Sequence, residues 1–444
     1  MKRFIDTHLL QWKQDPRRKV LLLRGARQVG KTYSIRELGK TFPYYVEINF
    51  DETPAIKELF THSLSVQQII ERLAVVRGTP INPGETLLFL DEIQACPEAL
   101  SALRYFQEKL PALHVAAAGS LLEFTLSEIP SMGVGRLHSL FMYPLSFLEY
   151  LSASGQEPLY QTVMNHPVSE ALEPVIHNQL LDMLRVFYLI GGLPGVVDHY
   201  LITHDLLQCQ ELLQDIATSY EDDFAKYKKK VPVARLREVF QSIIAQTGHK
   251  FSYAQVDSHS YHKAMKEALD LLILAGLAYK VPNSSCRGVP LGATINPKHF
   301  KMLPFDVGIA QRILGLDLAD IVLQSQKELV NRGAMTEVFC GLELVHSQVG
   351  NYKPELYYWH RESRGSQAEV DYVISSRSNV LPIEVKAGSK GQMQSMNIFL
   401  KERNLPRGVR ISQENFSVYD HIQVLPLYAA SRCWTLDNMH LYSL

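Results

Sequence analysis

The sequence has no excess of charge of one sign and no long hydrophobic run. Its 444 residues contain 45 lysines and arginines against 46 aspartates and glutamates, which gives a formal net charge of -1. Composition alone therefore gives no argument for nucleic-acid binding, although a net charge near zero does not exclude a local basic patch. The longest apolar stretch, 268–279, contains Asp270 and is too short to cross a bilayer.

Cysteine is also scarce. The five cysteines are scattered, and no pair of them has metal-ligand spacing, so neither a disulfide framework nor a cysteine-based zinc site is expected. The first residues, MKRFIDTHLLQWKQD, lack the apolar core of a signal peptide. We expect a cytoplasmic protein with no membrane association. The hydrophobic content of 46% is enough for large cores, and the length predicts two to four domains.

A phosphate-binding loop follows the first apolar segment. Residues 19–23 have the apolar pattern of a buried parallel strand, and a helical pattern begins at residue 33. The segment between them has the P-loop spacing of two glycines followed by lysine and threonine. Its glycines let backbone N–H groups surround phosphate oxygens, and the helix N-terminus favours an anion. We predict that ATP binds through Gly25, Ala26, Arg27, Gln28, Val29, Gly30, Lys31, Thr32 and Tyr33.

Two acids complete the predicted ATP site. Lys31 would reach the β- and γ-phosphates, and the Thr32 hydroxyl would bind Mg²⁺. Residues 86–90 form an apolar strand that ends in Asp91 and Glu92, which is the Walker B pattern. Asp91 would hold Mg²⁺ through water, and Glu92 would orient and polarise the attacking water. The alternative is a pair of acids at the start of a helix, where negative charge is favourable.

Two further residues are candidates for sensing the γ-phosphate. Ser120 follows the strand-like segment 114–118 and could either contact the γ-phosphate or cap a helix. Arg136 could reach the γ-phosphate of its own or a neighbouring subunit, or it could be an ordinary surface arginine. A further strand-like segment, 44–50, lies between the two motifs and, with Glu92, is typical of hydrolytic P-loop proteins. Catalysis is therefore expected from Lys31, Glu92, Ser120 and Arg136.

Five segments together resemble a widespread prokaryotic family of AAA+-like ATPases with a C-terminal domain of unknown function. They are RKVLLLRGARQVGKTY, LLFLDEIQACP, AAAGSLL, GRLHSLFMYPLSFLEYL and IGGLPGVV, and the match covers nearly the whole chain. With the periodicity of the apolar residues, the resemblance implies an α/β protein in four parts. These are a P-loop ATPase core at 1–150, a helical lid at 151–225, a winged-helix-like unit at 226–310 and an α/β domain at 311–444.

A basic cluster lies at the start of the winged-helix-like unit. Two functions are open for it, a contact with the phosphates of DNA or RNA, or a solvated or protein-docking face. Its members are Lys226, Lys228, Lys229, Lys230, Arg235 and Arg237.

The C-terminal domain carries a second candidate site. Alternating patterns around Asp371 and around Glu384 and Lys386 predict two adjacent strands with these side chains on one face. The set resembles the restriction-endonuclease-like fold, in which the acids hold Mg²⁺ and the lysine activates water. Glu337, on a helix expected over 331–344, would add a further acid. The alternative is an ion network that stabilises the domain.

Three functions remain in competition. The first is an ATP-hydrolysing switch whose C-terminal domain binds a partner, either nucleic acid or protein, and this is the one we favour. The second is an ATP-gated, metal-dependent nuclease that uses both sites. The third is a nucleotide-bound scaffold with little turnover, against which the presence of Glu92 argues. Relatives of the AAA+ type often form rings, but the sequence leaves the oligomeric state of this chain open, with both a monomer and an oligomer as alternatives.

Overall fold

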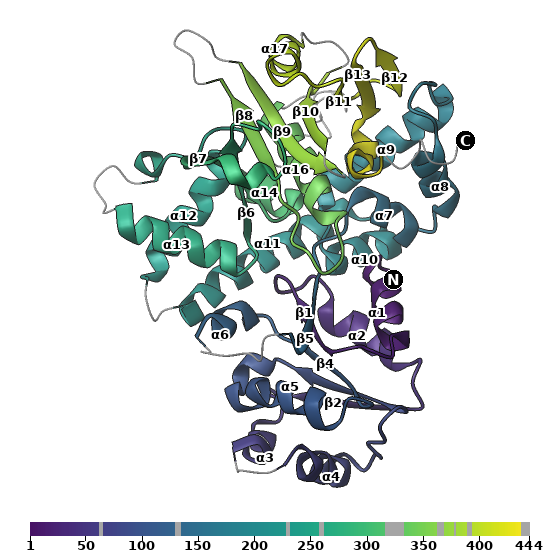
Figure 1. Cartoon of the computed structure of the whole chain (residues 1–444), viewed down its shortest axis with the longest axis vertical. Coiled ribbons are helices and arrows are strands. Elements are labelled where there is room, and N and C mark those ends of the chain that lie inside the picture. The colour runs from purple at the N-terminus through teal and green to yellow at the C-terminus, as the bar shows by residue number, and fades with distance from the viewer. Residues whose placement is uncertain are drawn as a thin grey trace. The chain divides into compact units, whose positions relative to one another are not determined.

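The structure, a computed structural model, describes residues 1–61, 65–128, 135–227, 231–256, 262–315, 333–361, 368–376, 379–388 and 393–436. Contacts divide the chain into two units, Met1–Tyr143 with Gln348–Lys353, and Pro144–Ser347 with Pro354–Leu444. Each unit contains a β-sheet with helices packed against it (Figure 1). The predicted α/β class, with a P-loop core and a further C-terminal α/β domain, is confirmed. The finer division of residues 151–444 stays a prediction.

The N-terminal unit is built on a five-stranded parallel sheet. Its order is β2 (Tyr44–Asn49), β3 (Thr86–Asp91), β4 (His114–Ala118), β1 (Val20–Arg24) and β5 (Leu137–Phe141). The apolar runs of β3 and β4 are buried along their whole length, as expected for strands covered on both faces. Because β4 lies between β1 and β3, the segments that follow these three strands meet at one edge of the sheet.

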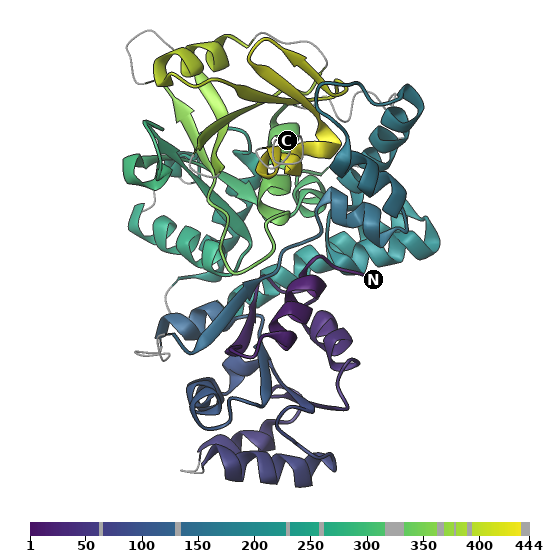
Figure 2. The same ribbon diagram turned by 45° about the vertical axis from the view of Figure 1, so that its right-hand side comes forward.

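Helices cover both faces of this sheet. Helices α4 (Val66–Arg77) and α5 (Pro97–Lys109) pack against one face, in a core that includes Leu22 and Leu90. The purple helices α1 (Ile5–Gln14) and α2 (Lys31–Gly39) lie on the other side of the strands in Figure 2.

Between β2 and β3 the chain forms three short helical pieces instead of one long helix. They are the 3₁₀ turn η1 (Pro54–Lys57), α3 (Glu58–Thr61) and α4. Ser65 starts α4 with a capping box, in which its hydroxyl accepts from the backbone N–H of Gln68. This local signal is present in the sequence and explains why a new helix begins there.

Residues 348–353 belong to the N-terminal unit although they are distant in sequence. The backbone N–H of Phe141, at the end of β5, donates to the carbonyl of Gly350 over 2.8 Å. The Lys353 ammonium lies 5.2 Å from the centre of the Phe141 ring. The chain therefore returns to the edge of the ATPase sheet between α16 (Gly333–His346) and β8 (Tyr357–His360).

The second unit contains an eight-stranded sheet of mixed direction. Its order is β12 (Ser417–Tyr419), β13 (Ile422–Pro426), β11 (Gly408–Ser412), β10 (Asn379–Val385), β9 (Glu369–Ser376), β8, β6 (Ala278–Ser284) and β7 (Ile295–Pro304). The antiparallel pair β6–β7 joins the rest where Asn283 pairs with Tyr358 of β8. The expected winged-helix-like unit and the C-terminal domain therefore share one sheet. Helix α16 packs against β7 and β10, and α17 (Gln394–Arg403) packs against β9 and β10.

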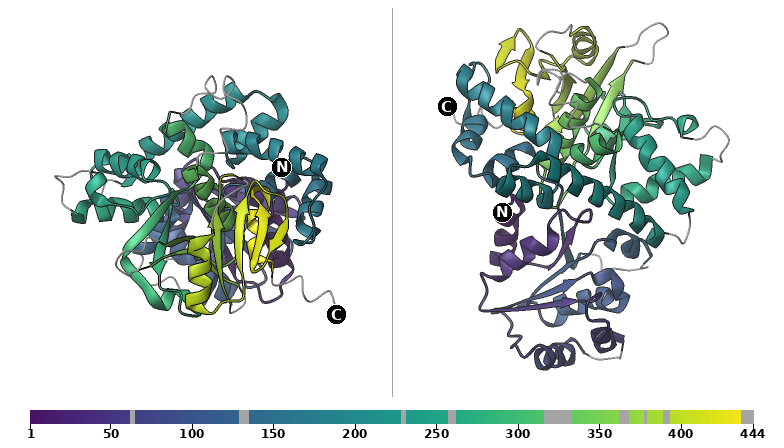
Figure 3. Two further views of the ribbon diagram at one scale, coloured as in Figure 1. Left: turned by 90° about the horizontal axis from the view of Figure 1, so that it is seen from above. Right: turned by 180° about the vertical axis from the view of Figure 1, so that it is seen from behind.

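The segment expected to form a lid is helical. It contains α8 (Glu157–Asn165), α9 (Pro174–Ile190), α10 (Pro194–Thr203) and α11 (Leu206–Asp223). The teal helices α9 to α11 are in front in the right-hand view of Figure 3. The other helices of this unit are α7 (Phe147–Ala153), α12 (Val233–Ala245), α13 (His262–Leu274) and α14 (Val307–Ile313). Within the described residues, no helix is both long enough and apolar enough to cross a membrane.

The glycines of IGGLPGVV make a tight backbone crossing between α9 and α10. Gly191 has a φ of +69°, and a Cβ there would lie 2.3 Å from the carboxylate of Asp306. Asp306 accepts from the N–H of Gly192 over 2.7 Å and also caps α14 through the N–H of Ile309. The motif therefore has a packing role that only glycine permits at Gly191.

Candidate functional site

The phosphate-binding loop connects β1 to α2, as predicted. Gly30 precedes the helix with a φ of +94°, and Gln28 has a φ of +63°. A Cβ on Gly25 would lie 2.1 Å from the carbonyl oxygen of Met142, so the chain after β5 approaches this glycine too closely for any side chain. The buried guanidinium of Arg3 donates to the carbonyls of Val29 (2.8 Å) and Tyr143 (2.9 Å). The loop is therefore held by neighbours on both sides.

Lys31 is buried at the start of α2. Its ammonium donates to the carbonyls of Gly25 (2.9 Å) and Ala26 (2.7 Å) within the loop. Burial is the largest influence and lowers the pKa of Lys31 to about 8, although the charges of Glu92 and Asp91 oppose this shift. A phosphate group brought to the loop would favour the charged form of this lysine.

Thr32 and Asp91 lie together, as a shared magnesium site requires. The Thr32 hydroxyl donates to Asp91 Oδ2 over 3.0 Å, so the two predicted ligand oxygens are neighbours. Burial raises the pKa of Asp91 to about 6. Hard oxygen donors of this kind suit Mg²⁺. These residues therefore fit the metal ion that accompanies ATP.

Glu92 is held by three hydrogen bonds to a single carboxylate oxygen. Its Oε2 accepts from the Gln94 side chain (2.6 Å), from the Ser120 backbone N–H (3.1 Å) and from the Ser120 hydroxyl (3.0 Å). Burial alone would raise the pKa of Glu92, but these hydrogen bonds outweigh it and lower the pKa. The carboxylate is therefore ionised at neutral pH, as a group that polarises water must be.

The Gly119–Ser120 pair is explained by this arrangement. A Cβ on Gly119 would lie 1.9 Å from the side-chain oxygen of Gln94, so a larger residue would displace Gln94 from Glu92. Ser120 contacts Glu92 because β4 lies beside β3. The structure thus brings together Thr32, Asp91, Glu92 and Ser120, with Lys31 near enough to interact electrostatically with both acids.

Arg136 is not brought to this group by any contact that the structure shows. Its guanidinium pairs with Glu108, near the end of α5, over 2.5 Å. Tyr33, the last residue of the predicted loop set, is 45% exposed. Arg27 is half-buried. Their assignment to nucleotide binding stays a prediction.

Sequence reasoning missed two polar groups near the loop. The first is Gln94, whose contact with Glu92 depends on the fold. The second is Arg24 at the end of β1, which forms a double ion pair with Glu123 of α6 (Leu122–Glu128) and lies 4.8 Å from the centre of the Phe141 ring. A charged residue at the end of the apolar run LLLR was the available signal.

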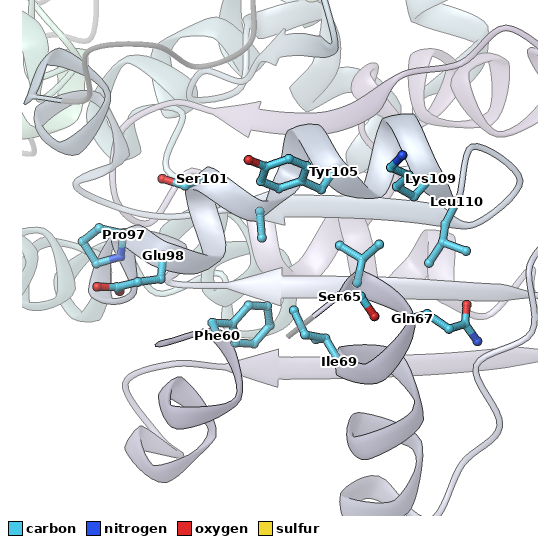
Figure 4. A pocket seen from close by; sticks show the side chains of 12 residues that line it. Phe60, Ser65, Gln67, Ile69, Pro97, Glu98, Ser101, Tyr105, Lys109 and Leu110 are labelled. Carbon is cyan, nitrogen blue, oxygen red and sulfur yellow. The ribbon is translucent and has the colours of Figure 1, made fainter. Parts of the chain in front are cut away.

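A hollow of about 830 Å³ lies elsewhere on the N-terminal unit, between α3, α4 and α5. Figure 4 shows Phe60 and Ile69 on one side and Tyr105 on the other. None of the predicted nucleotide-binding residues lines it. It is therefore separate from the ATP site.

The C-terminal candidates lie on neighbouring elements. Strands β9 and β10 are antiparallel neighbours, which confirms that Asp371 and Glu384 come from adjacent strands. Asp371 accepts from the backbone N–H of Val385 over 2.8 Å, and Lys386 pairs with Glu384 over 2.7 Å. Glu337 is on α16, whose described part begins at Gly333.

An unpredicted lysine lies among these acids. Lys301, from β7, is 2% exposed, and its ammonium is 2.8 Å from Glu337, 2.6 Å from Glu369 and 4.0 Å from Asp371. Burial opposes its charge, but Glu337, Asp371 and Glu369 together raise the pKa of Lys301 well above its usual range.

The acids do not fit a metal ion in this arrangement. In the part of the chain that the structure describes, no three acidic, histidine or cysteine side chains are placed to hold one. The role of Lys301 was missed in the sequence. The available signal was a single charged residue in the mostly apolar segment HFKMLP, but strand β7, which carries it, was not predicted.

The three described members of the basic cluster each pair with an acid. Lys226 pairs with Asp223 (2.7 Å), and Arg235 pairs with Glu238 (2.8 Å). Arg237 pairs with Glu221 over 3.1 Å. The remaining members, Lys228, Lys229 and Lys230, lie outside the described residues.

Comparisons with known proteins find family matches to three parts of the chain. Residues 17–151 match the family described as AAA domain. Residues 181–320 and 332–430 match two domains of unknown function, DUF8612 and DUF4143. No curated protein matches the chain.

Three solved structures resemble this chain, all with low TM-scores and low sequence identity. The Walker-type ATPase PABY2304 of Pyrococcus abyssi has a TM-score of 0.45 and 17% identity, over 70% of this chain and 95% of that chain. The ORC1 protein of Aeropyrum pernix in complex with DNA has a TM-score of 0.30 and 14% identity, over 73% and 95%. Drosophila ORC bound to DNA has a TM-score of 0.25 and 14% identity, over 70% and 94%. Similarities this distant carry no information on function.

Proposed function

We propose that the chain is an ATP-hydrolysing switch driven by the AAA-type P-loop ATPase domain of residues 17–151. The observation that carries this proposal is the group formed by Thr32, Asp91, Glu92 and Ser120 beside Lys31. These are the residue types that phosphoryl transfer from Mg·ATP to water requires.

Each residue has a distinct role in the proposed reaction. Lys31 and the loop N–H groups bind the phosphates, and Thr32 and Asp91 hold the Mg²⁺ of Mg·ATP, which neutralises phosphate charge. Glu92 orients and polarises the attacking water, and Ser120 both positions Glu92 and senses the γ-phosphate. Gln94 donates to the same carboxylate oxygen of Glu92 and so helps to fix its position. Arg136 is proposed to reach the γ-phosphate, from the same subunit or from a neighbour in an oligomer.

The experiment that tests this role is steady-state phosphate release by wild type and Glu92→Gln. Glutamine keeps the shape of the side chain and a carbonyl oxygen that can accept from Ser120, so the fold should persist. Loss of a water-polarising group typically lowers a rate roughly 100- to 10,000-fold. We expect a fall in turnover within that range with ATP binding retained. Hydrolysis by Glu92→Gln at the wild-type rate would show that Glu92 is misassigned and that another group polarises the water; negligible turnover by wild type itself would favour the scaffold.

The C-terminal unit is proposed to bind a macromolecular partner in response to the nucleotide state. A protein or a nucleic acid are the two classes predicted from the sequence. The described members of the basic cluster pair with carboxylates, which reduces the charge available for phosphates. Five buried free thiols support a reducing, cytoplasmic setting.

An ATP-gated nuclease is the second candidate. Asp371, Glu384 and Lys386 on adjacent elements favour it, because metal-dependent nucleases of this type use such a set. Lys301 argues against it, since its ammonium already contacts Glu337 and Glu369. We therefore place partner binding first.

A further inference from the structure

Lys301 links the β6–β7 pair to the acids of the C-terminal site. It comes from the strand at one end of the eight-stranded sheet. Its ammonium reaches Glu337 on α16 and Glu369 on β9, over 2.8 and 2.6 Å. The Tyr358 ring of β8 lies under it, with the ring centre 5.3 Å away. One positive charge therefore lies at the meeting point of three elements.

The acids around it are numerous and close together. Glu337, Glu369, Asp371 and Glu384 contribute four carboxyl groups, and Lys301 and Lys386 contribute two ammonium groups. The Oε2 atom of Glu384 is buried and has no hydrogen-bond partner in the structure. Burial, with the charge of Asp371 next, raises the pKa values of Glu337 and Glu384. An acid cluster of this kind needs a cation at its centre.

We propose that Lys301 is a built-in cation that takes the place of a divalent metal in this cluster and excludes such a metal. A Mg²⁺ ion would bind the same carboxylate oxygens at about 2.1 Å. The ammonium is already 2.8 Å from Glu337, 2.6 Å from Glu369 and 4.0 Å from Asp371, so an ion bound to the oxygens of these three acids would need the space that the ammonium fills. Lys301 also has little exposure through which to withdraw, since it is 2% exposed.

As a consequence, the acids of this cluster pair with an ammonium group of the same chain instead of a metal ion. Lys301 ties the β6–β7 pair to β9 and α16, so the acids stabilise the joint between the segment expected to be winged-helix-like and the rest of the sheet. Removal of this one charge would leave the carboxylates free to bind a divalent ion, for which oxygen ligands are suited. This inference is independent of ATP hydrolysis, because it concerns only the second unit.

The test is Mn²⁺ binding without nucleotide, measured by loss of the free Mn²⁺ signal in electron paramagnetic resonance. Wild type and Asp371→Asn should bind the same amount of Mn²⁺, because the cluster is closed to the metal in both. Lys301→Met removes the charge and keeps a long apolar side chain. This variant should gain one Mn²⁺ site, with an affinity at least tenfold higher than that of any Mn²⁺ site in wild type. The double variant Lys301→Met/Asp371→Asn should lose that site again.

The matched control is Lys280→Met on the neighbouring strand β6. Lys280 is exposed and lies over the Phe300 ring, with the ring centre 4.3 Å away. This variant should bind Mn²⁺ as wild type does. The proposal is overturned if folded Lys301→Met binds no more Mn²⁺ than wild type. It is also overturned if wild type binds one Mn²⁺ that Asp371→Asn loses, a comparison that decides the matter even if Lys301→Met does not fold.

Discussion

ATP binding should weaken steeply above pH 8 because Lys31 loses its proton in the free protein. Lys31 is 7% exposed, and burial lowers its pKa to about 8 from the ordinary value of 10.5. The phosphates of ATP bring negative charge to this lysine and should restore its charged form in the complex. ATP and a proton therefore bind together when the pH lies above 8.

The size of the loss in ATP affinity follows from the lowered pKa of Lys31. A group with a pKa of about 8 is half protonated at pH 8, so ATP binding there should take up about half a proton. At pH 9 the affinity should be about tenfold lower than at pH 7, because about one molecule in eleven then carries charged Lys31. The full shift from 10.5 to about 8 corresponds to roughly 3 kcal/mol, which bounds the loss of binding free energy at higher pH.

Isothermal titration calorimetry with Mg·ATP between pH 7 and 9.5 measures both quantities. Titrations in two buffers with different ionisation enthalpies give the number of protons taken up on binding. The binding constants give the dependence of the ATP affinity on pH. Lys31→Arg is the matched control, because arginine stays charged throughout this range. A flat affinity in wild type, or an equal slope in Lys31→Arg, would refute the assignment of the pH dependence to Lys31.

Two further predictions concern the fold and the second candidate function. Burial lowers the pKa of His114 to about 4, and its Nδ1 atom is buried without a hydrogen-bond partner. In the unfolded chain the same imidazole takes up a proton below about pH 6.5. The free energy of unfolding should therefore fall by about 2 kcal/mol between pH 7.5 and 5. Urea denaturation should show this loss in wild type and in a control with exposed His421→Gln, but not in His114→Phe; equal losses in all three would contradict it. Wild type should not cleave single- or double-stranded DNA or RNA with Mg²⁺ or Mn²⁺, with or without ATP. Cleavage that disappears in Asp371→Ala would instead establish the ATP-gated nuclease.

The ATP site was largely predictable because its parts are local in sequence. The apolar run before Gly25 and the one before Asp91 each specify a buried strand that ends at a functional residue. Parallel strands then bring their ends to one edge of the sheet. The contact between Ser120 and Glu92 could not be predicted locally, because it depends on β4 lying beside β3.

The C-terminal cluster was only partly predictable, since its charge balance depends on a long-range contact. Asp371 and Glu384 are 13 positions apart and alternate on paired strands, which the period of two reveals. Lys301 lies 36 residues before Glu337 on a strand whose sequence, INPKHFKMLP, has no clear alternation. No local rule pairs these two residues, so the difference between a metal site and an ion network appears only in the folded chain.

The identity of the nucleotide that stays bound after a single turnover tests the proposed ATPase most directly. Protein in excess over radiolabelled ATP would be incubated with Mg²⁺ and desalted rapidly, and the bound nucleotide would be separated by thin-layer chromatography. We predict that wild type retains ADP, whereas Glu92→Gln retains ATP over the same period, because only the polarisation of water by Glu92 has been removed. Bound ADP that accumulates in Glu92→Gln as fast as in wild type would contradict the account.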